Sequence, residues 1–146
     1  MKNMRGVYLV EFTIVAAALL MLIFGCIELG RATYTMAVLD EGTRRAARLA
    51  AVCPINDPAI TAAVNFMGAN GFNNSNVAVN YLDVNGASLG AAPAVASVYY
   101  VKVSVVGYTI PLAIPGLSET ITSPSFAVTL PAESLGLSNT GVSTAC

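Results

Sequence analysis

Histidine and tryptophan are absent from the 146-residue sequence, and charged residues are scarce at 10%. Without histidine, neither a Ser-His-Asp nor a Cys-His catalytic arrangement can form within this chain. The acidic residues beyond residue 53 share no motif; they are Asp57, Asp83, Glu119 and Glu133. We therefore expect a protein that is not an enzyme and that has no catalytic residues.

Cysteine is also rare, and basic residues form no long run. Cys26, Cys53 and Cys146 lie far apart without any Cys-x-x-Cys pair, so a zinc or redox site has no support. Residues 83–86 imitate part of a calcium-binding loop, but the glutamate that would complete the loop is missing, and a tight turn is the better account. A net charge of −1 argues against a nucleic-acid partner. The sequence thus predicts neither a metal nor another cofactor.

Apolar residues, by contrast, make up 55% of the chain. Residues 7–27 are uncharged except for Glu11, and they follow a short basic segment that ends at Gly6. A helix rises about 1.5 Å per residue and a bilayer core is about 30 Å thick, so residues 7–27 can form a transmembrane helix. A buried core helix is the alternative, but the rest of the chain is too small to surround one. Lys2 and Arg5 favour a cytoplasmic N-terminus with the C-terminal part outside.

The helix is expected to continue beyond the apolar segment. No proline occurs between residues 7 and 52, and apolar residues recur at helical spacing after residue 28. One face is predicted to carry Leu29, Ala32, Met36, Leu39, Ala46 and Leu49. Residues 28–52 should therefore form an amphipathic continuation of the same helix, and two helices hinged at Gly30 are the alternative.

From Cys53 the composition changes to Gly, Pro, Asn, Ser and β-branched residues, which predicts an extracytoplasmic domain of residues 53–146. A short helix is expected at about 58–68, with Asp57 as its N-cap. Strands are predicted within residues 76–86, 98–108 and 121–131. The expected fold is α+β and pilin-like, with one small antiparallel sheet packed against the lower end of the long helix.

Each predicted strand carries a local signal. The first ends in Asn85 and Gly86, which are typical of a hairpin turn. In the second, alternate valines should face the core while Lys102 and Ser104 face the other way. Pro124 confines the start of the third strand to an edge or a bulge.

The start of the chain supports a more specific hypothesis. Residues 1–6 form a basic leader that ends at Gly6, and Glu11 is the fifth residue after that glycine. This arrangement resembles the class III signal of type IV prepilins. The resemblance implies that a prepilin peptidase cuts between Gly6 and Val7 and that Glu11 and Phe12 act in assembly. Without the resemblance, Glu11 has a simpler explanation, a carboxylate near the interface that reaches water.

The first 50 residues look like the start of TadE-like proteins, pseudopilins of the tight-adherence (Tad/Flp, type IVc) pilus machinery. The match rests on Val10, Glu11 and Phe12 and on the motif Glu-Leu-Gly-Arg at residues 28–31. The resemblance implies a subunit of the inner membrane that joins other pilin subunits and the Tad assembly machinery. The resulting extracellular pilus would serve adhesion and biofilm formation. Tyr8 and residues 41–44 depart from the family pattern, so a main subunit and a minor pseudopilin both remain open.

Cleavage would give Glu11 a partner. A cut after Gly6 creates a charged amine on Val7. Buried unpaired charges are unfavourable by several kcal/mol, whereas paired ones are tolerated. We therefore expect the Val7 amine and the Glu11 carboxylate of neighbouring subunits to compensate each other and to set the spacing of subunits.

The cysteines leave further alternatives. Residues 23–26 approximate a lipobox, so the chain could instead be lipid-anchored at Cys26, although Phe24 is bulky there and Glu11 interrupts the signal. A single-pass anchored binding protein is the other alternative. Cys53 and Cys146 can form a disulfide if the domain lies outside the cytoplasm, and the alternatives are two free thiols or a bond to another subunit.

Overall fold

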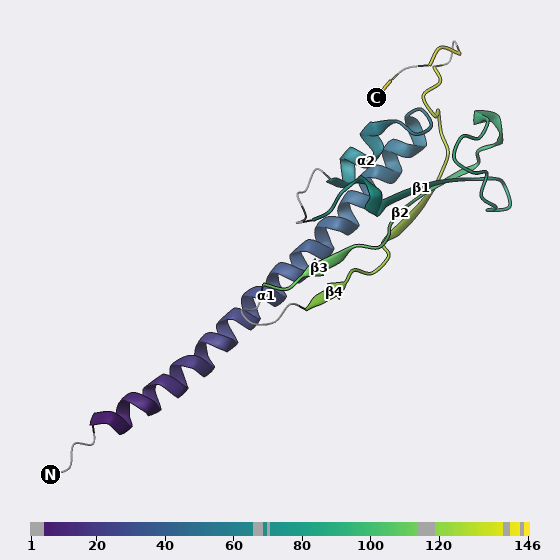
Figure 1. The fold of residues 1–146 in the computed structure, drawn as a ribbon. Helices are drawn as coiled ribbons and strands as arrows, with labels where there is room; N and C mark the ends of the chain where they lie inside the picture. Colours follow the sequence, from purple (N-terminus) through teal and green to yellow (C-terminus); the bar gives the residue numbers. More distant parts are fainter. Residues whose placement is uncertain (1–4, 66–68, 70, 114–118, 139–140, 144) are drawn as a thin grey trace.

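The structure is a computed structural model that describes residues 5–65, 69, 71–113, 119–138, 141–143 and 145–146. Its main element is α1 (Arg5–Val52), a single helix of 48 residues that projects as a rod from the rest of the molecule (Figure 1). At 1.5 Å per residue, α1 is about 70 Å long. The helix runs unbroken through Gly30, so the alternative of two hinged helices is wrong. The first four residues of the predicted leader lie outside the described residues.

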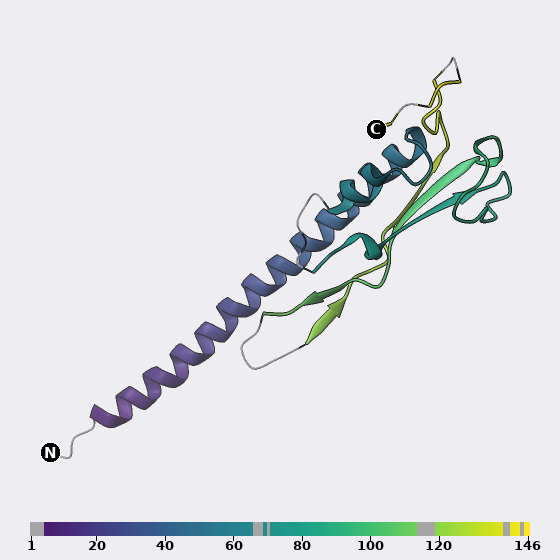
Figure 2. The ribbon, with the colours of Figure 1, turned by 45° about the horizontal axis from the view of Figure 1, so that its top comes forward.

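The two halves of α1 have different surroundings. Residues 6–27 are exposed on every side, with only Ala16 partly covered, whereas the domain packs along the second half (Figure 2). On the predicted apolar face, Ala32, Leu39 and Ala46 are buried. Leu29 is 67% exposed, so its place on that face was predicted wrongly. Leu29 is turned by about 100° from its neighbour Glu28, whose side chain faces the domain.

A second helix, α2 (Pro58–Asn65), runs back along the end of α1. It begins where predicted: the side chain of Asp57 accepts a hydrogen bond of 2.8 Å from the backbone N–H of Ala59. The predicted continuation to residue 68 lies outside the described residues. The helices approach closely at Gly42, where an added Cβ would lie 3.2 Å from the Cα of Val64.

Two small antiparallel sheets complete the domain, together with the 3-10 helices η1 (Asn74–Asn76) and η2 (Val95–Ser97). The larger sheet has the order β1-β2-β5. Its strands are β1 (Val77–Leu82), β2 (Tyr100–Val105) and β5 (Ala127–Pro131). The smaller sheet is the hairpin of β3 (Thr109–Pro111) and β4 (Thr120–Thr122).

The prediction of one sheet was therefore wrong. Residues 121–131 contribute to both sheets, because the ladder is interrupted around Pro124, which has no N–H to donate. As expected from this proline, β5 is an edge strand. Asn85 and Gly86 do form a turn, which is closed by a bridge between Leu82 and Ser88, but this turn does not join β1 to its partner β2.

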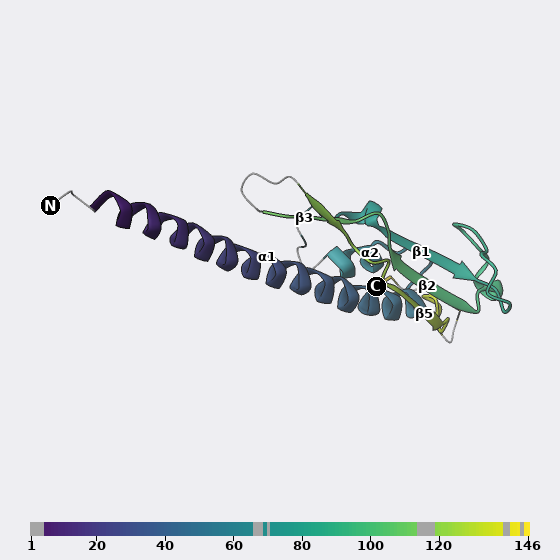
Figure 3. The ribbon, with the colours of Figure 1, turned by 90° about the horizontal axis from the view of Figure 1, so that it is seen from below.

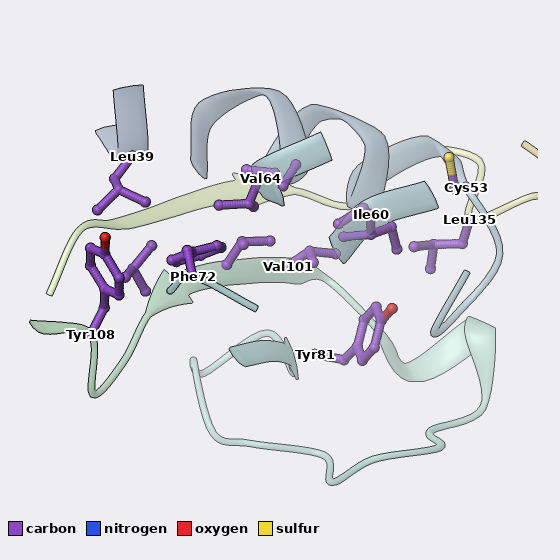
Figure 4. Close-up of a cluster of buried hydrophobic side chains, with 14 of the residues drawn as sticks. Leu39, Cys53, Ile60, Val64, Phe72, Tyr81, Val101, Tyr108 and Leu135 are labelled. Carbon is purple, nitrogen blue, oxygen red and sulfur yellow. The ribbon is translucent and has the colours of Figure 1, made fainter. Parts of the chain in front are cut away.

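The core lies between the two helices and the larger sheet (Figure 4). Val101, Val103 and Val105 are fully buried and Lys102 is exposed, as the alternation predicts. Ser104 is on the opposite face and is nevertheless buried, next to its cross-strand partners Ala78 and Ala127. This core fixes the domain to the second half of α1 and leaves the first half free.

The C-terminal segment returns to the end of α1. The backbone N–H of Glu133 donates to the carbonyl of Ala51 at 2.9 Å, and that of Gly136 donates to the carbonyl of Val52 at 2.6 Å. The hydroxyl of Ser134 also donates to Val52. Since the last carbonyls of a helix have no partner within it, the segment acts as the C-cap of α1.

Candidate assembly site on the N-terminal helix

The residues predicted to act in processing and assembly lie on the first turns of α1. Val7 is 67% exposed and Phe12 is 74% exposed, and Gly6 and Glu11 are exposed as well. Around them is a helix whose most apolar window has a mean hydropathy of 2.5, with none of it buried. The first half of α1 therefore has the length and composition of a membrane anchor.

Gly6, Val7 and Glu11 share one face of the helix. Together with Val10 and Ile14 they line a shallow hollow. Residues four apart on a helix are neighbours on its surface, so an amine at Val7 would lie close to Glu11 of the same chain. Phe12, the other residue predicted to act in assembly, does not line this hollow.

The side chain of Glu11 has no hydrogen bond or ion pair within the part of the chain that the structure describes. A carboxylate in this position is unfavourable in a bilayer core, by about 2.5–3.5 kcal/mol at the helix centre on insertion scales. The hollow thus contains a carboxylate that is accessible to a cation from outside the chain.

A second polar feature lies where the apolar segment ends. The Glu28 side chain is buried and accepts a hydrogen bond of 3.2 Å from Nε of Arg31, one turn farther along α1. Its Oε1 atom also accepts from Nη2 of Arg31 and, at 3.1 Å, from the backbone N–H of Ala113. Arg31 in turn donates to the carbonyl of Pro111. We call Glu28 and Arg31 the clamp, because they bind the β3–β4 hairpin to α1.

The groups that contact the Glu28 side chain shift its pKa. The hydrogen bond from Arg31 holds the pKa of Glu28 below its ordinary value, and burial, which acts in the opposite direction, does not cancel it. The amide of Ala113 lowers the pKa further. Glu28 is therefore an ionised, fully hydrogen-bonded carboxylate at neutral pH.

The sequence predicts the ion pair of the clamp but not its contacts with the hairpin. An acid and a base three residues apart predict an ion pair on a helix. No local signal indicates that Pro111 and Ala113 complete the cluster.

Farther along α1 lie two more ion pairs, Asp40 with Arg44 and Glu41 with Arg45, both at 2.9 Å and largely exposed. Both have the spacing of four residues that favours pairing on a helix surface. Unlike the clamp, they contact no other element through these bonds. Both ion pairs are exposed to solvent on the surface of α1.

The cysteines fall into two groups. Cys53 and Cys146 form a disulfide that joins residues 93 apart in sequence, with a Cα–Cα distance of 5.7 Å. Cys26 is free and exposed on the apolar half of α1. Within the described residues no three His, Cys, Asp or Glu side chains gather as metal ligands would.

Comparison with known protein families agrees with the motif at the start of the chain. The family model described as TadE-like protein matches residues 6–48, which include Gly6, Glu11 and the clamp. The match confirms the resemblance over nearly all of α1. No curated protein and no solved structure matches the chain.

Proposed function

Starting from the TadE-like identity of residues 6–48, we propose that this chain is a pilin-like subunit that assembles through α1 into a Tad-type pilus or its assembly complex. In this proposal a prepilin peptidase cuts between Gly6 and Val7, and residues 7–27 anchor the mature chain in the inner membrane. The observation that carries the proposal is the bare apolar half of α1, with Gly6, Val7 and Glu11 on one exposed face.

The proposed orientation places the N-terminus in the cytoplasm and the domain of residues 53–146 outside. The disulfide between Cys53 and Cys146 supports this orientation, because disulfides persist in oxidising compartments and are rare in the cytosol. The basic residues Lys2 and Arg5 support it too.

Glu11 would set the register of assembly. Its exposed carboxylate pairs with the amine that cleavage creates on Val7, and the partner amine belongs to the neighbouring subunit. The pairing removes the cost of an isolated charge among apolar helices. Phe12 takes part in the packing of these helices.

A Glu11→Lys variant tests this role. We expect the variant to insert in the inner membrane but to be missing from sheared pili and from the purified assembly complex. Glu133→Lys makes the same change of charge on the exposed C-terminal segment and should assemble like the unmodified chain. Assembly of the Glu11→Lys variant at the unmodified level would refute the register role.

The alternative is an anchored binding protein that does not assemble, held either by α1 or by a lipid on Cys26. The free, exposed Cys26 is the observation in favour of the lipid-anchored form. These forms differ in the mature N-terminus, which would be Met1 for the helix-anchored protein and acylated Cys26 for the lipoprotein.

A further inference from the structure

The clamp lies at a defined height on the helix. Glu28 is 22 residues beyond Gly6 in the sequence, which corresponds to about 33 Å along a helix axis. The hydrocarbon core of a bilayer is about 30 Å thick. When residues 7–27 span the membrane, Glu28 and Arg31 therefore lie at its outer boundary.

The clamp brings the end of β3 and the residues that follow it, up to Ala113, to the same height. Ala113 is bonded to Glu28 through its backbone N–H, and Pro111 is bonded to Arg31 through its carbonyl. The opposite side of the hairpin is held level with them, because the N–H of Leu112 donates to the carbonyl of Glu119 at 3.0 Å. Figure 3 shows β3 extending along α1 from the domain toward the bare half of the helix.

The described part of the hairpin suits a lipid surface. Residues 109–113 and 119–122 contain a single charged side chain, that of Glu119. Ala113 and Ile121 are exposed and Leu112 is partly exposed. Threonines supply hydroxyl groups for the headgroup layer, and Arg31, whose charge is paired with Glu28, keeps 34% of its side chain exposed at the same level. The described part of the hairpin thus presents a small surface of apolar and hydroxyl groups with one charge.

We propose that residues 109–113 and 119–122 of the β3–β4 hairpin form a second membrane contact, which rests on the outer leaflet and is fixed to α1 by the clamp. The contact limits the tilt of the domain and holds it close to the bilayer before assembly. The inference rests on the proposed function in one respect, because α1 must span the membrane for the hairpin to reach its surface. The hairpin contacts lipid, because it is held level with the end of the apolar segment.

Site-specific fluorescence quenching tests the contact. In a Cys26→Ser background with the native disulfide kept oxidised, a nitrobenzoxadiazole label is attached at Ala113→Cys, Ala17→Cys or Asn85→Cys. Each protein is reconstituted in phosphatidylethanolamine/phosphatidylglycerol vesicles that carry nitroxide either on the headgroup or deep on the acyl chain. Ala17 reports on the span, and Asn85 lies on an exposed turn of the domain.

We expect the label at position 113 to lose most of its fluorescence to the headgroup nitroxide. The label at position 17 should lose it to the acyl-chain nitroxide, and the label at position 85 to neither. The hairpin contact would be overturned if the label at position 17 were quenched while the label at position 113 were quenched no more than the label at position 85. The membrane anchor would stand in that case. A label at 17 that is not quenched would overturn the span and the hairpin contact together.

The clamp is tested with the same label. Glu28→Ala should abolish the headgroup quenching at position 113 while quenching at position 17 is unchanged. Glu41→Ala is the matched control, because it removes another ion-paired glutamate of α1 that holds no other element, and it should change neither signal. Unchanged quenching at 113 in Glu28→Ala would show that the clamp does not position the hairpin.

Discussion

The carboxylate of Glu28 accepts a hydrogen bond of 3.1 Å from the backbone N–H of Ala113, a residue 85 positions later in the sequence. This bond joins the end of the apolar segment of α1 to the β3–β4 hairpin. Arg31 strengthens the connection, since it bonds both to Glu28 and to the carbonyl of Pro111. Glu28 and Arg31, which lie within the residues that the TadE-like model matches, thus have a structural role in this fold.

Acidification should release this bond only below the ordinary titration range of glutamate. The folded-state pKa of Glu28 is lowered, chiefly by the hydrogen bond from Arg31, so its stabilising effect is fully present above the unfolded-state pKa of about 4.3. The effect is lost as the pH falls through the lowered folded-state pKa. The measurement is the amide chemical shift of Ala113 against pH, by NMR in detergent micelles.

In Glu28→Gln, which cannot ionise, this titration of the Ala113 amide should disappear. A midpoint at or above the ordinary glutamate value in the unmodified chain would contradict the geometry of the clamp.

Gly42→Ala should destabilise the domain even though alanine is the better helix former. The new Cβ would lie 3.2 Å from the Cα and 3.3 Å from the carbonyl oxygen of Val64, and both are backbone atoms that cannot move away alone. Overpacking of this kind costs about 1–3 kcal/mol, compared with about 1 kcal/mol gained in helix propensity. Thermal unfolding in detergent measures the difference.

Gly30→Ala is the matched control for this substitution. An added Cβ at Gly30 meets nothing within 4 Å, so only the gain in helix propensity remains. The control should be as stable as the unmodified chain or more so. If Gly42→Ala were stabilised to the same degree as Gly30→Ala, the close approach of α2 to α1 would be wrong.

Cys146→Ser should loosen the C-terminal segment from α1. The disulfide closes a loop of 93 residues, and the loss of a native disulfide typically costs about 2–5 kcal/mol in a small secreted domain. We expect a lower unfolding temperature and faster hydrogen exchange at Gly136, whose N–H donates to Val52. Cys26→Ser removes the free cysteine and should leave both quantities unchanged; equal effects of the two substitutions would argue against the pairing.

Much of the helical part could be predicted because its signals are local. The absence of proline up to residue 52 predicts the single helix, and Asp57 followed by Pro58 predicts the start of α2. The alternation of Val101 and Val103 with Lys102 likewise predicts which face of β2 is buried. Each of these signals lies within the element that it predicts.

The errors have a common physical cause, which is tertiary contact. The exposure of Leu29 depends on where the domain meets α1, and helical spacing alone does not give that place. The division of the strands into two sheets depends on how the chain pairs on either side of Pro124. The clamp needs the backbone of Pro111 and Ala113, whose approach to α1 follows from the whole fold.

The central claim is that the chain is a processed pilin-like subunit, and the intact mass of the membrane-extracted protein tests it most directly. The chain is expressed with and without a prepilin peptidase, and a Gly6→Leu variant, whose bulky side chain should block cutting, serves as the control. We expect a peptidase-dependent mature chain that begins at Val7. Recovery of the whole chain from Met1 in the presence of an active peptidase, or of a chain that begins at acylated Cys26, would contradict it.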